Sequence, residues 1–499
     1  MKVELQRFMN ERKWNELFDM LEASVSSVFS TPFINQTYKV IKDVDVTLSE
    51  RCLPRLIFAW MAFLCGDHTR AFPIVQGIAP EMLESPEAES MYEGLLALSG
   101  YTNNPEIGLA HAARSVEVLK GRGSSLYLGN AFLTYGQLLA SSNQYRKAAD
   151  IFHRSYEVFY PRGDDFAAAV ALTNEALNRY RLGQFHEVLD ICNNELSKSS
   201  DFQSAGNAYW QILNLPMGMC YYEQARFHLA LESLEKAKLT IDSFGLLHMH
   251  GIGEVMLYRC YAVLNLNDKM IEMRAEFEKQ FESVHAEYIK EMLAWMDLVF
   301  GGGETQVARE TMEMLYERYG SKARFIVLES LLWVQDRENE SILKVADLIK
   351  LVEMFRDKGN LPMQQRSLLT LSSVYMLARE PSEANAALAK AVEIERESSM
   401  RAGFFELPLS IRDGMKVINH EVVRILGEKK EPKQNYVLSE REREIMSFIA
   451  VGKTNAEIGQ LLFISKGTVK WHTNKIFGKL GTSNRIQAVE KAKLMGEIE

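Results

Sequence analysis

Pairs of small side chains twelve residues apart recur along the first four hundred residues of this chain. The pairs are Gly136 and Ala148, Ala176 and Val188, Gly218 and Ala230, and Ser372 and Ala384. In the first three pairs an aromatic residue stands nine positions after the first member: Tyr145, Phe185 and Phe227. Small residues let two helices approach closely, so each pair predicts a helical hairpin. Because one hairpin cannot bury its apolar face alone, the hairpins are expected to stack on one another.

This repeat resembles the tetratricopeptide repeat in a lengthened form. Large residues four positions after the second small residue are expected to fill the gap between neighbouring hairpins: Phe152, Leu234 and Leu388. Alternating apolar and polar residues bounded by turn signals, the pattern of a strand, are almost absent. The sequence therefore predicts an α-solenoid over residues 1–426.

The concave face of such a solenoid, made by the first helix of each hairpin, is the natural place for a partner. By repeat position, the polar residues expected on that face are Asn130, Gln137, Thr173, Tyr180 and Tyr222. We interpret them as candidate effector-binding residues. An ordinary solvated helix surface would also place polar residues there.

Helical periodicity stops at residues 427–435, GEKKEPKQN, where charge and proline predict a linker. Beyond it, Thr454 and Glu457 have the spacing of a capping box, which starts a short helix whose buried face would be Ile458, Leu461 and Leu462. Ser465 can cap a further helix from about Lys466 to Leu480. The turn between these two helices is so short that it predicts a helix-turn-helix.

The last of these helices has two contrasting faces at 100° per residue. Val469, Thr473, Ile476 and Leu480 fall on one side and are expected to pack, whereas Lys470, Trp471, Asn474 and Gly478 fall on another. Lysine can donate to guanine, asparagine can pair with adenine, and tryptophan can lie against sugar or a thymine methyl group. Lys470, Trp471 and Asn474 are therefore the predicted base readers.

Positive charge is concentrated around this helix. From Ser465 to Arg485 the chain has five basic residues and no acidic one, which is typical of a surface that binds phosphate. The predicted phosphate contacts are Ser465, Lys466, Thr468, Lys475, Lys479 and Arg485. These contacts would set the register on double-stranded DNA without reading its sequence.

Residues 436–499 resemble the C-terminal domain of LuxR-type (GerE-like) bacterial transcription regulators. The matching segments are Leu438 to Glu442 (LSERE), Gly452 to Ile458 (GKTNAEI), Ser465 to His472 (SKGTVKWH) and Ile476 to Leu480 (IFGKL). The resemblance implies a four-helix unit whose fourth helix, from about Ser483 to Met495, forms a homodimer contact on DNA. Trp471 and Gly478 depart from the polar or basic residues common at these positions, so the preferred DNA sequence cannot be carried over.

The whole layout is similar to the C-terminal half of regulators typified by the activator of bacterial maltose genes. This resemblance implies a transcription regulator, an activator, in which a small molecule or a protein binds the repeats. The bound effector shifts an equilibrium in which the DNA-binding domain is masked or free, or the protein is monomeric or oligomeric. RNA polymerase is a further candidate partner. The ATPase module of those regulators has no counterpart, because no complete phosphate-binding loop occurs in the chain.

Charge is divided unevenly between the two predicted parts. Residues 436–499 carry a net charge of +3 and the whole chain carries −9, so residues 1–435 carry −12. An acidic body is not expected to bind DNA. Five widely separated cysteines, no signal peptide and no membrane-length apolar run predict a cytoplasmic protein.

Motifs of catalysis are missing from the sequence. The chain has no H-E-x-x-H, no G-x-S-x-G and no clustered metal-ligand spacing, so we expect neither an enzyme nor a cofactor or metal. The prediction is thus an all-α protein with a tetratricopeptide-like α-solenoid, a linker (427–435) and a small four-helix helix-turn-helix domain (436–499). The alternative is a protein-interaction scaffold whose tail has lost productive DNA binding through Trp471 and Gly478.

Overall fold

The structure is a computed structural model of the 499-residue chain. It describes residues 2–23, 34–101, 104–121, 125–198, 205–244, 250–280, 286–301, 305–427, 438, 440–462, 466–480, 482 and 484–494. Within these ranges every regular element is a helix, as predicted. The chain forms two compact units, residues 1–419 and residues 420–499. The predicted limits of 1–426, 427–435 and 436–499 stay a prediction, because most of the linker lies outside the described ranges.

The first unit consists of successive helices. They are α1 (Lys2–Asn10), α2 (Trp14–Ala23), α4 (Ile34–Ile41), α5 (Cys52–Leu64), α6 (His68–Gln76), α7 (Pro86–Tyr101), α8 (Pro105–Leu119), α9 (Leu126–Ser141), α10 (Tyr145–Phe159), α11 (Asp165–Arg181), α12 (Phe185–Lys198), α13 (Ala205–Trp210), α14 (Asn214–Glu223), α15 (Phe227–Phe244), α16 (His250–Val263), α17 (Asn267–Gln280), α18 (Ala286–Phe300), α19 (Thr305–Tyr319), α20 (Phe325–Glu338), α21 (Val345–Asp357), α22 (Leu361–Leu377), α23 (Pro381–Ser398), α24 (Ala402–Phe405) and α25 (Leu409–Ile418). Single-turn 3-10 helices lie at Val46–Leu48, Pro80–Met82, Tyr160–Arg162, Gln211–Leu213 and Gly320–Lys322.

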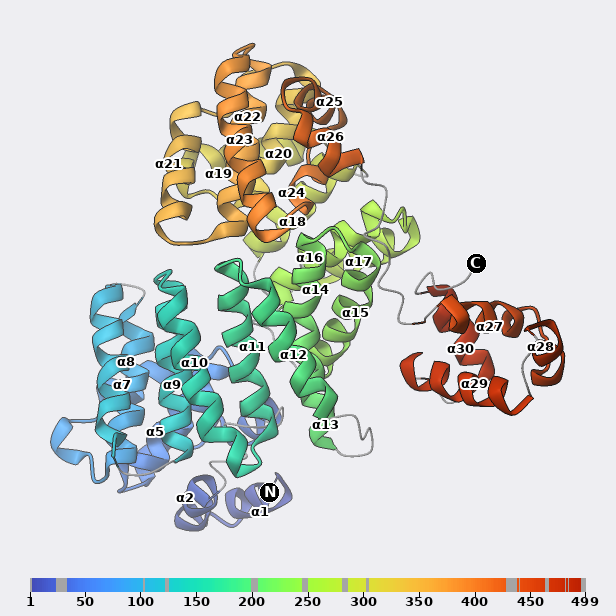
Figure 1. The fold of residues 1–499 in the computed structure, drawn as a ribbon. Coiled ribbons are helices and arrows are strands. Elements are labelled where there is room, and N and C mark those ends of the chain that lie inside the picture. The colour runs from blue at the N-terminus through green and yellow to red at the C-terminus, as the bar shows by residue number, and fades with distance from the viewer. Residues whose placement is uncertain are drawn as a thin grey trace. The chain divides into compact units, whose positions relative to one another are not determined.

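Neighbouring helices pair into hairpins, such as α9 with α10, α14 with α15 and α22 with α23 (Figure 1). The predicted small residues lie where the helices of a pair meet. A Cβ atom at Gly136 would lie 2.8 Å from the ring of Phe152, and one at Gly218 would lie 2.7 Å from Leu234. These large side chains therefore fill the space inside their own hairpin, whereas the sequence placed them between hairpins.

A left-handed residue marks the turn inside several hairpins. Asn143, Gly183, Ala225 and Arg379 have φ angles of 61°, 76°, 58° and 62° and stand seven positions after the first small residue of each pair. Glycine and asparagine adopt this conformation readily, but alanine and arginine do so at a cost of about 1–2 kcal/mol. The turn geometry is thus imposed by the repeat and not by the local residue.

This strain predicts a stabilising substitution at one turn. Ala225→Gly should raise the free energy of unfolding by about 0.5–1 kcal/mol, because glycine relieves the left-handed strain. The matched control is Ala386→Gly at an exposed helical position of α23, which should lower it by about 1 kcal/mol. Urea unfolding with unchanged slope measures both changes, and a loss of stability in Ala225→Gly would contradict the assignment.

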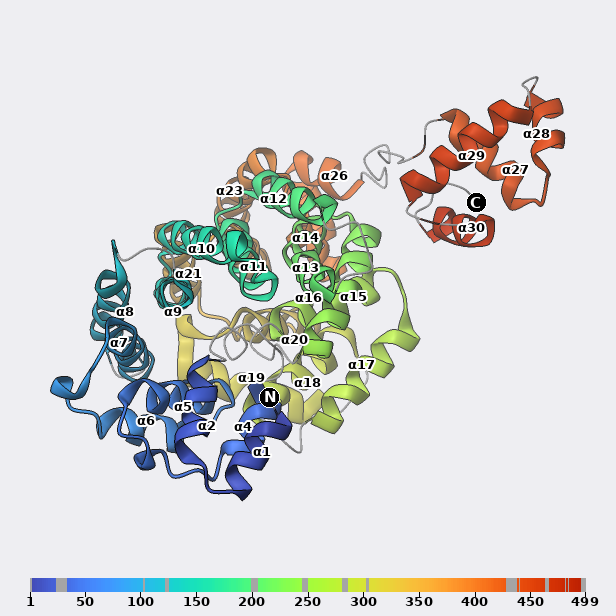
Figure 2. The ribbon, with the colours of Figure 1, turned by 90° about the horizontal axis from the view of Figure 1, so that it is seen from below.

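Successive hairpins of the first unit are arranged around a curve, seen end-on in Figure 2. The start of α22 lies against the turns of earlier hairpins, far away in sequence. Asn360 Nδ2 donates to the hydroxyl oxygen of Tyr145 at 3.4 Å. A Cβ atom at Gly183 would lie 2.4 Å from Cδ2 of Leu361. Repeats that are not neighbours along the chain therefore contact one another within the solenoid.

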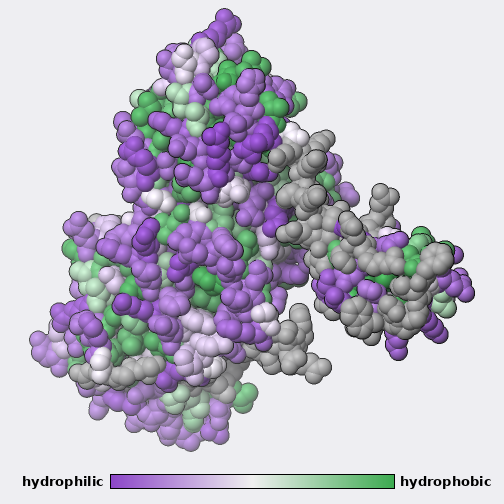
Figure 3. Space-filling view, viewed as in Figure 1, coloured by the Kyte–Doolittle hydropathy of each residue, from purple (hydrophilic) through white to green (hydrophobic). Residues whose placement is uncertain are grey.

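The visible surface of the first unit is mostly hydrophilic, with apolar side chains scattered over it (Figure 3). Among the described residues, no helix is both long and apolar enough to cross a membrane. All five cysteines are free thiols, and Cys52, Cys192, Cys220 and Cys260 are buried.

The second unit contains α26 (His420–Gly427), α27 (Glu440–Ala450), α28 (Asn455–Leu462), α29 (Lys466–Leu480) and α30 (Arg485–Leu494). The limits predicted for the third helix of the helix-turn-helix domain are those of α29. Helices α27 to α30 share one apolar core, to which α30 contributes Ala488 and Ala492. Such a small core holds α29 in place between α27 and α28.

Candidate functional site

The turn that leads into α28 follows from local sequence chemistry. Gly452, with a φ of 84°, ends α27, and the Lys453 amide donates to the Phe448 carbonyl oxygen at 3.0 Å. The Thr454 amide donates to Glu457 Oε2 at 2.7 Å, and the Glu457 amide donates to Thr454 Oγ1 at 3.4 Å. This reciprocal pair confirms the predicted capping box.

The packed face of α29 is also confirmed. Val469, Thr473, Ile476 and Leu480 are all buried. On α28, Ile458 and Leu462 are buried, but the prediction for Leu461 is wrong, because its side chain is 49% exposed. Gly459 is buried in its place, so the inner face of α28 is centred between Ile458 and Gly459 and turns Leu461 outward.

Of the predicted DNA contacts, Lys466 and Lys470 lie exposed on α29. The backbones of Thr468, Trp471 and Asn474 also belong to α29, but their side chains lie outside the described part of the structure. The predicted phosphate contact Ser465 lies outside the described residues altogether. The base-reading trio thus stays a prediction, carried by a helix whose opposite face is packed.

Three of the predicted phosphate contacts also have partners within their own domain. Buried Glu442 of α27 accepts a hydrogen bond from Lys479 Nζ at 2.6 Å, and Lys475 Nζ lies 3.7 Å from its other carboxylate oxygen. Arg485 donates to the carbonyl oxygens of Ile449 and Lys453 at the end of α27. Glu442 therefore joins α27 to α29, a role that the sequence did not reveal.

Removing this carboxylate is expected to loosen α29. Glu442→Ala should weaken the attachment of α29 to α27 by about 1–2 kcal/mol. The value is modest because Lys475 and Lys479 are both partly solvated. Amide hydrogen exchange over residues 466–480 should then be about 5–30 times faster. Glu444→Ala, an exposed position on the same helix, is the control. Unchanged exchange in Glu442→Ala would contradict this role.

The five predicted effector residues do not share one environment. Gln137 is exposed and Asn130 half-buried on α9, whereas Thr173 is buried on α11 and its hydroxyl donates to the Ala169 carbonyl oxygen at 2.7 Å. Tyr180 and Tyr222 are buried as well, and their hydroxyls donate to Glu223 Oε1 at 2.5 Å and Glu406 Oε1 at 3.1 Å. Only the two tyrosines therefore come together, in a cluster of buried charge.

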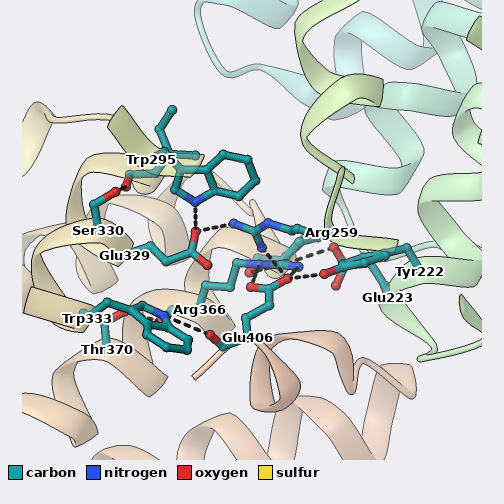
Figure 4. Close-up of polar contacts among 12 residues, drawn as sticks. Tyr222, Glu223, Arg259, Trp295, Glu329, Ser330, Trp333, Arg366, Thr370 and Glu406 are labelled. Atoms are coloured by element: carbon teal, nitrogen blue, oxygen red, sulfur yellow. Dashed lines mark hydrogen bonds and ion pairs between the residues drawn. The ribbon is translucent and has the colours of Figure 1, made fainter. Parts of the chain in front are cut away.

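This buried ionic cluster, shown in Figure 4, contains two arginines and three glutamates from five helices or their ends. We use the name for Glu223, Arg259, Glu329, Arg366 and Glu406. Arg259 pairs with both Glu329 and Glu406, and Arg366 pairs with both Glu223 and Glu406. The Trp295 indole Nε1 donates to Glu329 Oε2 at 2.9 Å. Because the members are far apart in sequence, no local sequence motif predicts the cluster.

Burial and pairing act differently on the pKa values of the carboxylates. Burial alone would raise the pKa of Glu406, but attraction to Arg259 and Arg366 lowers it to about 2. For Glu329, burial outweighs attraction to Arg259 and, with repulsion from Glu406, raises the pKa to about 7. Glu329 is therefore the carboxylate that takes up a proton near neutral pH.

A raised pKa in the folded state makes stability fall as the pH rises. The native state binds the extra proton, so this contribution is fully present below the ordinary glutamate pKa and lost as the pH passes about 7. Glu329→Gln, which stays neutral, should be more stable than the wild type at pH 8 by about 1–3 kcal/mol, with a smaller difference at pH 5.5. Urea titrations at both values measure it, and an equal difference at both would contradict the assignment.

Comparisons with known proteins agree with the helix-turn-helix geometry. Residues 436–492 match the family described as bacterial regulatory proteins, luxR family. Over 71 residues the chain is 41% identical to the spore germination protein GerE of Bacillus subtilis (strain 168), covering 96% of that protein and 14% of this chain. Over 67 residues it is 48% identical to the transcriptional activator protein SolR of Ralstonia solanacearum, covering 28% of that protein and 13% of this chain.

Among solved structures, a Rap protein complexed with competence and sporulation factor is similar with a TM-score of 0.45 and 13% identity. That similarity covers 78% of this chain and 100% of the Rap chain.

The fold and the site define a class of protein: a helix-turn-helix domain joined to tetratricopeptide-like helical repeats. The chain belongs to the luxR family of bacterial regulatory proteins. This is a family of transcription regulators and not a class of enzymes.

Proposed function

We propose that this protein is a sequence-specific, DNA-binding regulator of transcription, and an activator, whose helix α29 reads the major groove. Lys470, Trp471 and Asn474 contact base edges. The phosphate contacts are Ser465, Lys466, Thr468, Lys475, Lys479 and Arg485. A small molecule or a protein bound by the repeats controls the activity, which takes place in the cytoplasm.

One observation carries the proposal: α29, whose sequence has no acidic residue, buries one face in the domain core and leaves Lys466 and Lys470 exposed. A helix held in this way can enter a major groove while its positive charge meets the backbone. The activator role is supported by the similarity to SolR, which is a transcriptional activator protein. Pairing of two copies through α30 would give two recognition helices, and RNA polymerase would be the partner of an activator.

The second candidate is a protein-interaction scaffold with a tail that no longer binds DNA productively. The observation in its favour is the sequence itself, because helical periodicity predicts Trp471 and Gly478 on the outward side of α29, where polar or basic residues are common in the family. In that case the repeats would carry the whole function.

A binding selection from fragmented genomic DNA tests the two candidates. The full-length protein should enrich one sequence motif with two half-sites about one helical turn apart, as a homodimer requires. Enrichment without a common motif would leave only non-specific binding and favour the scaffold. Repeating the selection with cell extract shows whether an effector is needed.

A further inference from the structure

The buried ionic cluster contains a site for a carboxylate. Oε1 of Glu406 lies 2.5 Å from Arg259 Nη1 and 2.7 Å from Arg366 Nη2, and its Oε2 accepts from Arg366 Nε at 2.9 Å. The Tyr222 hydroxyl completes the set at 3.1 Å. A fork of two donors from one guanidinium, with a second guanidinium beside it, is the arrangement by which proteins recognise a carboxylate.

Glu406, which occupies this site, lies on a different kind of element from the two arginines that hold it. Arg259 and Arg366 lie within the long helices α16 and α22, whereas Glu406 directly follows α24, which has four residues. The segment Met400–Leu407, which contains α24, is held partly by its main chain. The Arg401 amide donates to the Glu223 carbonyl oxygen at 2.7 Å, and Gln365 Nε2 donates to the Met400 carbonyl oxygen at 2.9 Å. The segment thus lies in the solenoid as a bound peptide would.

The fit between this segment and the site is incomplete. Glu223 Oε2, Arg259 Nε and Gln365 Oε1 are buried and have no hydrogen-bond partner among the described residues. A buried polar atom without a hydrogen bond costs about 1–3 kcal/mol, so these atoms favour an occupant that pairs with them. A cavity of about 10 Å³, room for roughly one water molecule, adjoins Glu329, Trp333, Arg366 and Glu406. When Glu329 is ionised, its carboxylate also repels the carboxylate of Glu406.

We propose that Arg259, Arg366 and Tyr222 form a binding site for a ligand that carries a carboxylate, and that Glu406 occupies it as a built-in competitor. Exchange of one carboxylate for another leaves the charge of the cluster unchanged, so no buried charge is left unpaired. Binding then requires the segment Met400–Leu407 to leave. This segment precedes α25 and α26 in the chain, and these lead to the DNA-binding domain.

This inference rests on the proposed function only where it gives the ligand an effect on DNA binding. The site itself is defined by chemistry within the repeats. A ligand can shift the protein between two states only if it binds one of them better, and here the state with Glu406 displaced is the one that binds.

Chemical rescue is the first test, with acetate as the probe. Glu406→Ala removes the side-chain carboxylate and leaves room for acetate. Sodium acetate should raise the melting temperature of this variant by about 2 °C or more, in a saturable manner, relative to sodium chloride at equal ionic strength. The wild type and the double variant Arg366→Met/Glu406→Ala should show no such rise.

A peptide provides the second test, which also works on the unaltered protein. The probe is a fluorescein-labelled copy of residues 399–408, SMRAGFFELP, with a twin in which its glutamate is glutamine. The glutamate peptide should bind Glu406→Gln at least about tenfold more tightly than the wild type, because the tethered Glu406 competes at a millimolar effective concentration. In the wild type the glutamate peptide should still bind better than its twin.

The two tests together distinguish a small acid, a peptide and the absence of any ligand. A response to acetate alone indicates a small acid as the ligand, and a response to the peptide alone indicates a peptide. Equal effects of acetate and chloride, together with equal binding of the two peptides, would overturn the proposal and leave the cluster as a structural tie. None of these readouts uses DNA. Absence of a DNA motif would therefore overturn the proposed function without touching this site.

Discussion

Replacing Lys470 and Asn474 of α29 by alanine together is expected to abolish the preference of this protein for its target sequence. A good bidentate contact to a base is worth about 1–3 kcal/mol of discrimination, so loss of both contacts should lower the specific affinity about 100-fold or more. Non-specific binding should change far less, because phosphates supply most of it. Competition between a selected target and random DNA at fixed salt measures both quantities.

Lys390→Ala is the matched control, because it removes one exposed lysine from α23 in the acidic body. It should leave both affinities unchanged. If the Lys470→Ala/Asn474→Ala variant kept the preference for the target, another surface would read the sequence and the assignment of α29 as the reader would be wrong.

The largest expected effect on stability comes from Arg366 in the buried ionic cluster. Arg366→Ala leaves the carboxylates of Glu223 and Glu406 buried without their shared partner, and breaking a buried pair in this way costs about 3–5 kcal/mol. Such a loss approaches the whole stability of many proteins. The free energy of unfolding from urea titration measures it.

The control for Arg366 is Arg356→Ala. The side chain of Arg356 is 60% exposed and pairs with Asp357 at the surface, so its removal should change stability by no more than about 0.5 kcal/mol. Equal effects of the two substitutions would mean that solvent reaches the cluster and that its charges are not buried away from water.

Much of the fold could be predicted because its signals are local. Small residues twelve positions apart identified hairpins, and the spacing of Thr454 and Glu457 identified the start of α28. The limits of α29 followed from a capping residue and helical periodicity. The prediction for Leu461 is wrong, because the inner face of α28 is centred between Ile458 and Gly459, which buries Leu462 and turns Leu461 outward, and periodicity alone did not locate that centre.

The charged interior of the repeats could not be predicted in this way. Tyr222 was recognised by its repeat position, but its partner Glu406 lies 184 residues further along the chain. Arg259 and Arg366 each look like ordinary helix-surface residues in sequence, since nothing nearby indicates their burial. The same holds for Glu442, whose contact with Lys479 appears only when α27 and α29 are packed together.

Asn360 and Leu361 contact the turns at Tyr145 and Gly183, and these contacts bear on how cooperatively the repeats unfold. In a simple array each repeat touches only its neighbours, and stability is a sum of local terms, so that ends can fray and units can be removed. Here repeats that are distant in sequence hold one another. Residues 1–419 should therefore unfold in a single cooperative step, and deleting one internal hairpin should disrupt the whole unit instead of shortening it.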